Sequence, residues 1–259
     1  ARRGRYLAAN EALRAMCQHE GRPLSEACIF TAHTADDRIE NFYMRSIVGT
    51  GPGGFRSMLY RNGPVVRPLL DLTRDELRDY LSARESAGET VVRDESGALW
   101  REDATNAHTD RFRAYVRHKI VPVAKEWNSA LPEVLTRSMN LIADEDDMLQ
   151  NMAEKLAEES AEWVAEDDTF GIDRSEGFRL LPAFGKAERP LQRRAVLRLL
   201  EAMLGPDARV EAVLAGFANG APNSGYVANI QYDLAVSANK RGVLVEPMAY
   251  FRARRKKHD

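Results

Sequence analysis

The pattern of apolar and polar positions in the first half of the chain predicts helices that alternate with strands, as in an α/β protein. Residues 6–18 contain neither glycine nor proline and are rich in alanine and leucine, which predicts a helix. Residues 27–31 form a short apolar run that is typical of a buried strand in a parallel sheet. We expect a second helix over residues 34–48, ended by a glycine cap, and a second strand over residues 65–70.

Helical patterns follow along the rest of the chain and give way to short strands after residue 220. We expect helices over residues 73–86, 112–127 (bent near Pro122), 132–168 (one helix or two), 188–204 and 209–218. Strands are then expected over residues 226–230, 234–237 and 243–245. Because the texture changes near residues 126–132, we predict an α/β domain over 1–128, a mainly helical domain with a small β element over 129–250, and a basic, disordered tail over 251–259.

Composition narrows the class of protein. The chain has 259 residues with 37 basic and 39 acidic side chains, so nucleic-acid binding cannot be argued from its net charge of −2. Its two cysteines, Cys17 and Cys28, exclude a disulfide framework and a zinc-binding CxxC pair. Since the sequence has neither a membrane-length apolar run nor a secretory signal pattern, we expect a cytoplasmic protein with no membrane partner.

Residues 31–41 hold the densest group of chemically useful side chains. His33 follows the predicted strand, and Asp36 and Asp37 begin the next helix. Ligands of open α/β sheets bind outside the carboxyl ends of the strands. Two adjacent carboxylates beside a histidine are suited to hold Mg²⁺, orient an amine or act as acid and base. Acids in a first helical turn also merely stabilise the helix N-terminus, so the residues alone leave both interpretations open.

Charged runs occur elsewhere in the chain. Five basic side chains occur at near-helical spacing after residue 110. This spacing suits either phosphate binding or an ordinary solvated helix face. The five residues are Arg111, Arg113, Arg117, His118 and Lys119. Residues 138–168 contain eleven acidic residues and one basic residue, which predicts a solvated helix face that repels nucleic acid.

Five motifs occur in a fixed order along residues 1–122. They are His33-x-x-Asp36-Asp37-x-x-Glu40, Arg45-x-x-x-Gly49-Thr50-Gly51, Arg67-Pro68-Leu69-Leu70-Asp71, Trp100-Arg101-Glu102-Asp103-x-x-Asn106 and Arg113-x-x-x-Arg117-His118-x-x-x-Pro122. Together they resemble the tRNA(Ile)-lysidine synthetases of the PP-loop ATP pyrophosphatase superfamily. A looser similarity covers residues 181–247.

The resemblance implies a fold and a reaction. The fold is an incomplete Rossmann-like PP-loop domain, which holds adenine nucleotides, followed by a helical tRNA-binding domain. The reaction uses ATP and Mg²⁺ to adenylate the C2 carbonyl of the wobble cytidine in tRNA-Ile with a CAU anticodon. Free L-lysine then displaces AMP to give lysidine. The oligomeric state stays open.

The resemblance also implies roles for individual residues. The implied catalytic residues are Asp36, Asp37, Arg113 and Arg117, with Asp37 also binding metal. The implied ATP-binding residues are His33, Arg2 and Arg5. The implied substrate pocket contains Glu40, Arg101, Asp103 and Asn106. The implied tRNA-binding residues are Arg113, Arg117, His118, Lys119, Arg193 and Arg194.

Some positions depart from the family pattern. The phosphate-binding loop Ser-Gly-Gly-x-Asp-Ser does not occur in the sequence, so we expect the chain to begin after it. Tyr115 replaces a common arginine, and Ala32 replaces a common glycine. The alternative interpretation is a catalytically incomplete remnant that still binds tRNA. A tRNA thiolase is disfavoured by the lack of a cysteine pair, and a purely structural helical domain leaves the ordered motifs unexplained.

Overall fold

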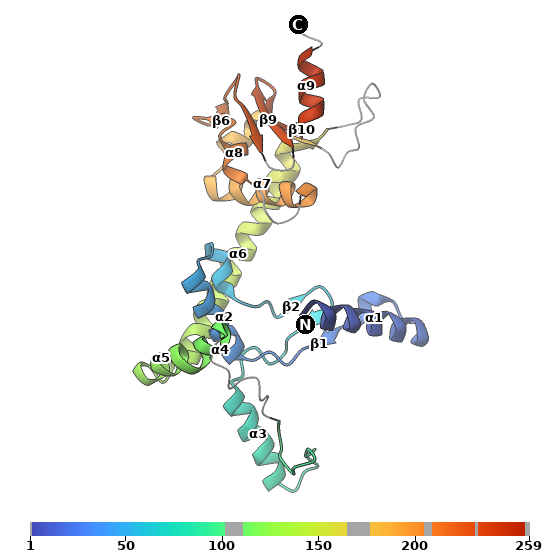
Figure 1. The fold of residues 1–259 in the computed structure, drawn as a ribbon, viewed down its shortest axis with the longest axis vertical. Helices are drawn as coiled ribbons and strands as arrows, with labels where there is room; N and C mark the ends of the chain where they lie inside the picture. The colour runs from blue at the N-terminus through green and yellow to red at the C-terminus, as the bar shows by residue number, and fades with distance from the viewer. Residues whose placement is uncertain (1, 102–110, 165–176, 205–208, 231–232, 257–259) are drawn as a thin grey trace. The chain divides into compact units, whose positions relative to one another are not determined.

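The long helix α6 (Leu131–Ser160) contains the division between the two compact units of the chain. The structure is a computed structural model that describes residues 2–101, 111–164, 177–204, 209–230 and 233–256. The units comprise residues 1–144 and 145–259 (Figure 1). The domain boundary at residue 128 stays a prediction.

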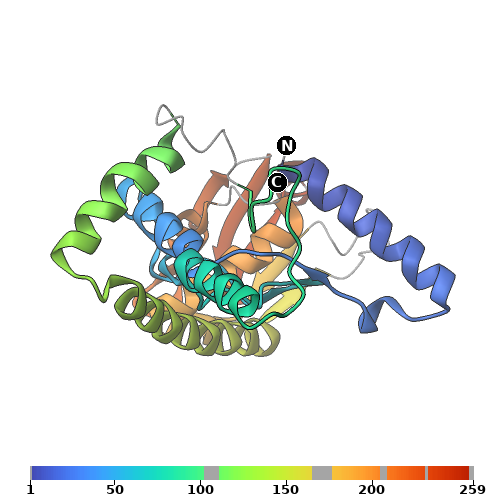
Figure 2. The same cartoon turned by 90° about the horizontal axis from the view of Figure 1, so that it is seen from below.

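A three-stranded sheet in the order β1-β3-β2 organises the first unit. Strands β1 (Ile29–Phe30) and β3 (Val65–Val66) pair in parallel, while β2 (Arg61–Asn62) pairs antiparallel with β3. The parallel pair confirms the α/β fold class, although both strands are shorter than their apolar runs. Helix α1 (Arg2–Glu20) is one unbroken helix beside β1 (Figure 2).

Capping boxes fix where two helices of the first unit begin. Helix α2 (Ala35–Val48) starts after Thr34, and α3 (Arg74–Ser86) starts after Thr73. In each box the threonine and the acid three residues later satisfy N–H groups that have no partner within the helix. These boxes fix the first turn of each helix, and both first turns contribute to the candidate site.

A π-helical segment interrupts the predicted helix over residues 112–127. Helix α4 (Phe112–Tyr115) passes into π-helical residues Val116–Ile120 and then into α5 (Val121–Trp127). Pro122 lacks an N–H and clashes with the carbonyl four residues before it, so the turn before it widens. Ile39, Val116 and Val121 form the apolar core under this segment.

The second unit packs helices against a five-stranded sheet in the order β4-β5-β10-β9-β8. All four pairings in this sheet are antiparallel. The strands are β4 (Ala161–Trp163), β5 (Phe178–Leu180), β8 (Val227–Ile230), β9 (Leu234–Asn239) and β10 (Gly242–Pro247). Helices α7 (Arg189–Leu204) and α8 (Val210–Leu214) supply much of its core, and β6 (Phe217–Ala218) pairs with β7 (Ala221–Pro222).

The structure corrects three expectations about this unit. Residues 209–218 were expected to form one helix, but α8 ends at Leu214, and Phe217–Ala218 form β6 because they pair with β7. Residues 161–163 were expected to be helical, but they form β4 because they pair with β5. The basic tail was expected to be disordered, but Met248–Lys256 forms helix α9. Phe251 of this helix is buried in a cluster with Met248 and Ala235, and Arg254 pairs with Glu246. The C-terminal residues are therefore held in place by the buried Phe251, although most of their side chains are charged.

Candidate active site

The first turns of α2 carry the three acids that the sequence analysis singled out. The Thr34 N–H and hydroxyl both donate to Asp37 Oδ2, at 2.9 and 3.1 Å. Asp36 lies directly before Asp37 in the same helical turn. Glu40 lies one turn later, and only 1% of the Glu40 surface is exposed. Helix geometry therefore places three carboxylates at the end of α2 that follows β1.

Four cationic side chains from other elements surround these acids. Arg113 donates from Nη2 to Asp37 (2.7 Å) and from Nε to Glu40 (2.8 Å). The Arg117 Nε donates to Glu40 at 2.6 Å, and the Lys125 Nζ donates to Asp36 at 3.2 Å. The acid–arginine cluster is defined as Asp36, Asp37, Glu40, Arg74, Arg113, Arg117 and Lys125.

Arg74 connects all three acids of the acid–arginine cluster. Its backbone N–H donates to Asp36 Oδ2 at 2.8 Å. Its Nη2 donates to Asp37 at 2.9 Å and to Glu40 at 3.2 Å. Because Arg74 is the first residue of α3, this one side chain joins the N-termini of two helices.

The cluster favours ionised side chains. Burial alone raises the pKa of Asp37, but the Thr34 N–H and the nearby Arg74 and Arg113 outweigh burial and lower it. Burial alone lowers the pKa of Arg74, but Glu40, Asp37 and Asp36 outweigh burial and raise it. Asp37 is therefore a carboxylate at neutral pH, suited to bind cations and not to donate a proton.

A cavity of about 650 Å³ adjoins the cluster through Arg113, which lines it. Arg5 and His33 line the same cavity, and the Nδ1 of His33 lies 3.0 Å from the Thr31 hydroxyl. The structure therefore brings two of the predicted ATP-binding residues together with one predicted catalytic arginine. Sequence reasoning gave no role to two further arginines of this cavity, Arg45 and Arg67.

Other predicted site residues lie elsewhere in the described structure. Arg101 is exposed and lies 3.6 Å from Asp94, and it lines neither the cavity nor the cluster. Asp103, Asn106 and the Arg2 side chain lie outside the described residues.

The predicted tRNA-binding residues fall into two groups. His118 and Lys119 are exposed on the π-helical segment. In the second unit Arg193 pairs with Glu211, and Arg194 pairs with Asp146. The roles of all four residues stay predictions.

The described side chains do not form a metal site. They contain no group of three His, Cys, Asp or Glu side chains placed to bind one ion. Asp37 Oδ1 already accepts from two guanidinium groups, and Asp36 Oδ1 accepts from Lys125. The binding of metal by Asp37 therefore stays a prediction, and it requires these partners to move.

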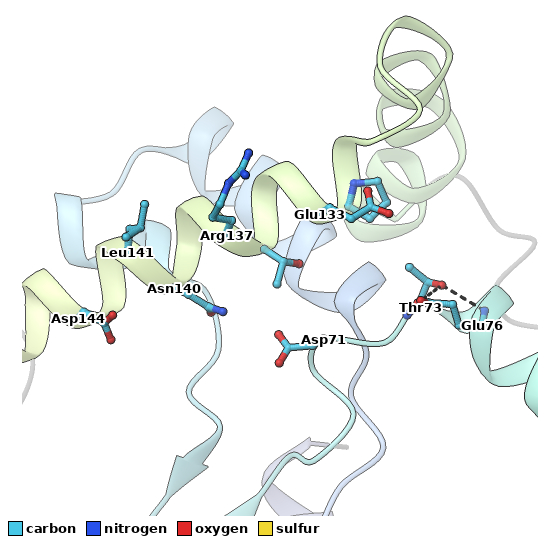
Figure 3. A pocket seen from close by; sticks show the side chains of 10 residues that line it. Asp71, Thr73, Glu76, Glu133, Arg137, Asn140, Leu141 and Asp144 are labelled. Carbon is cyan, nitrogen blue, oxygen red and sulfur yellow. Dashed lines mark hydrogen bonds between the residues drawn. The ribbon is translucent and has the colours of Figure 1, made fainter.

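A second cavity of about 440 Å³ lies between residues 71–76 and the first half of α6 (Figure 3). Asp71 and Asn140 face it, and both belong to a network around Arg38, which is 1% exposed. The Arg38 Nη2 donates to Asn140 at 2.8 Å, and its Nη1 donates to Asp71 at 3.3 Å. This network fixes α2, and thus the acids of the cluster, against α6.

Comparison with known proteins gives one family for the first unit. A family model of the PP-loop domain matches residues 1–124. Among the described residues, no helix has the length and apolar character that crossing a membrane requires.

Several curated relatives carry the same name. A tRNA(Ile)-lysidine synthase from Thermus thermophilus is 33% identical over 218 residues, which cover 83% of this chain and 38% of the relative. Proteins of that name from Porphyromonas gingivalis (39% over 111 residues, 42% of this chain and 22% of the relative) and Rhodopirellula baltica (32% over 151 residues, 56% and 35%) are also similar. The matched regions thus span 22–38% of the lengths of these three relatives.

Proposed function

Residues 1–124 belong to the PP-loop family, and from this premise we propose that the chain acts as part of a tRNA(Ile)-lysidine synthase. The proposed activity is an ATP-dependent ligation in the cytoplasm that joins free L-lysine to the wobble cytidine of tRNA-Ile with a CAU anticodon. The observation that carries the proposal is the acid–arginine cluster, which opens through Arg113 into a basic cavity of nucleotide size.

The proposed chemistry has two steps. The cytosine C2 oxygen attacks the α-phosphorus of ATP, which releases pyrophosphate and leaves AMP bonded to that oxygen. The ε-amine of lysine then attacks C2, and AMP departs with the oxygen while the nitrogen loses a proton. Mg²⁺ belongs to the proposal as the partner of the ATP phosphates, which suits its preference for keeping several waters.

The cluster supports both steps with opposite charges. Arg113 is 45% exposed and lines the cavity, so it is the member placed to turn towards phosphate oxygens while Arg74 keeps its bonds to Asp37 and Glu40. Asp36 already accepts from a primary ammonium, that of Lys125, so its carboxylate suits the amine of a substrate lysine.

A turnover assay with variants of the acids tests this proposal. Asp36→Asn and Asp37→Asn are each expected to lower lysidine formation by about 100-fold or more, because a positioned carboxylate typically contributes that much to proton transfer. Affinity for tRNA is expected to stay within about twofold, since the change removes no phosphate-binding group. The assay follows AMP release and labelled lysine on tRNA.

Asp79→Asn is the matched control, because Asp79 is an exposed acid of α3 outside the cluster. Wild-type turnover in both acid variants contradicts the roles of Asp36 and Asp37. Binding of tRNA by the unmodified chain without any AMP release supports the alternative of a tRNA-binding remnant.

A further inference from the structure

We propose that Arg45 and Arg67 form a phosphate-binding subsite in the cavity, separate from the acid–arginine cluster. The inference rests on the proposed function, which supplies phosphate from two sources. These are the phosphates of ATP and the backbone phosphates of RNA beside the modified nucleotide. Both present the same anionic oxygens.

Arg67 is buried without a carboxylate. Only 6% of its surface is exposed, and its Nη1 donates to the Leu59 carbonyl at 2.8 Å. Its Nε is buried and has no hydrogen-bond partner among the described residues. Removing a guanidinium from water is costly unless an anion and hydrogen bonds replace the water. No carboxylate among the described residues pairs with Arg67, and its side chain lines the cavity.

Arg45 reaches the same cavity from the last turn of α2. No described carboxylate pairs with it, and the glycine-rich loop after α2 fits closely around it. A Cβ added at Gly54 would lie 2.9 Å from the Arg45 Nη1 and 1.8 Å from the Thr50 hydroxyl. The loop therefore holds Gly54 so close to the Arg45 and Thr50 side chains that a larger residue at position 54 would force them to move.

The rest of the cavity wall favours an anion. Four arginines line it, and none of its described lining residues is acidic. Asn41 and Ser57 add polar groups to the wall, with the Asn41 amide donating to the Ser57 hydroxyl at 3.1 Å. Arginine suits phosphate because its planar group donates two parallel hydrogen bonds to anionic oxygens.

Binding measurements with the full chain test the subsite. The probes are ATP, adenosine as the phosphate-free match, and a hairpin RNA with the CAU anticodon loop. Arg67→Met is expected to weaken binding of at least one phosphate-bearing probe about tenfold or more, because a charge-assisted hydrogen bond is lost. Adenosine binding is expected to stay unchanged. A loss for ATP alone identifies the nucleotide as the phosphate source, and a loss for RNA alone identifies the RNA backbone.

Arg61→Met is the control, because Arg61 is exposed on the neighbouring strand and, among the described residues, donates only to the Gly63 carbonyl. It removes the same charge and is expected to change each affinity less than about twofold. The unfolding transition of Arg67→Met shows whether the variant folds. If Arg67→Met folds and binds ATP and RNA as the wild type does, the proposal is overturned.

Unfolding temperatures measured with added inorganic phosphate distinguish a failure of the subsite from a failure of the proposed function. If the wild type binds neither ATP nor RNA, the function fails. The subsite still stands if phosphate raises the unfolding temperature of the wild type and of Arg61→Met but not of Arg67→Met. Equal phosphate stabilisation of all three overturns the subsite.

Discussion

Two sets of arginines lie in the first unit, and they differ in whether a carboxylate of the protein neutralises their charge. Arg74, Arg113 and Arg117 each donate to Glu40, and two of them also bond Asp37. Arg45 and Arg67 line the cavity with no described carboxylate in contact. The first set contributes to holding the native arrangement together, whereas the second has a charge that the protein leaves for a ligand. The partner of a buried charge thus indicates its role better than its burial does.

The largest expected effect comes from removing the acid shared by the first set. Glu40→Gln leaves three guanidinium groups with an uncharged amide in a buried position. We expect a loss of about 2–3 kcal/mol of unfolding free energy, below the range for a fully buried pair because the arginines are partly exposed. Denaturant unfolding measures this. Glu89→Gln, which breaks an exposed pair with Arg84, is the control and should leave the unfolding free energy nearly unchanged.

The same substitution at two buried arginines sharpens the comparison. Arg38→Met removes the hydrogen bonds that Arg38 donates to Asp71, Asn140 and the Tyr60 hydroxyl, so we expect a loss of about 1–3 kcal/mol. Arg67→Met removes one described hydrogen bond, to the Leu59 carbonyl. It also replaces a buried charge that no described carboxylate neutralises with an apolar side chain. Its unfolding free energy should lie within about 1 kcal/mol of the wild type. Equal losses at both positions would show that the distinction between the two sets is wrong.

The smallest expected effect is the acid dependence due to Asp37. Its folded pKa lies below the ordinary value of 3.8, so its ionised form stabilises the folded state above that pH. This stability is lost as the pH falls through the folded pKa. We therefore expect Asp37→Asn to lose less unfolding free energy than the wild type as the pH falls below about 4. A series of denaturant titrations measures the difference, and identical slopes would refute the assignment.

Local patterns predicted the elements that hold the acids. Residues close together in the sequence form the capping boxes at Thr34 and Thr73 and the apolar runs of β1 and β3. From them one could place Asp36 and Asp37 at a strand–helix junction. These signals depend only on short-range hydrogen bonding and periodicity, which a sequence displays directly.

The cations of the site could not be predicted in the same way. Arg74 and Lys125 lie 38 and 89 residues from Asp36 along the chain, and nothing near them in sequence marks the pairing. Arg67 was visible as part of a motif, but its burial without a carboxylate is a property of the folded cavity. Long-range pairing therefore determined which charges are balanced and which are left for a ligand.

The most direct test is a crystal structure of the chain bound to ATP or to the anticodon hairpin RNA. The quantity to measure is the distance from the nearest guanidinium nitrogen of Arg67 to a phosphate oxygen. We predict about 2.7–2.9 Å, the range of a charge-assisted hydrogen bond. Phosphate oxygens bound by other residues, with no guanidinium nitrogen of Arg67 in contact with them, would contradict the account.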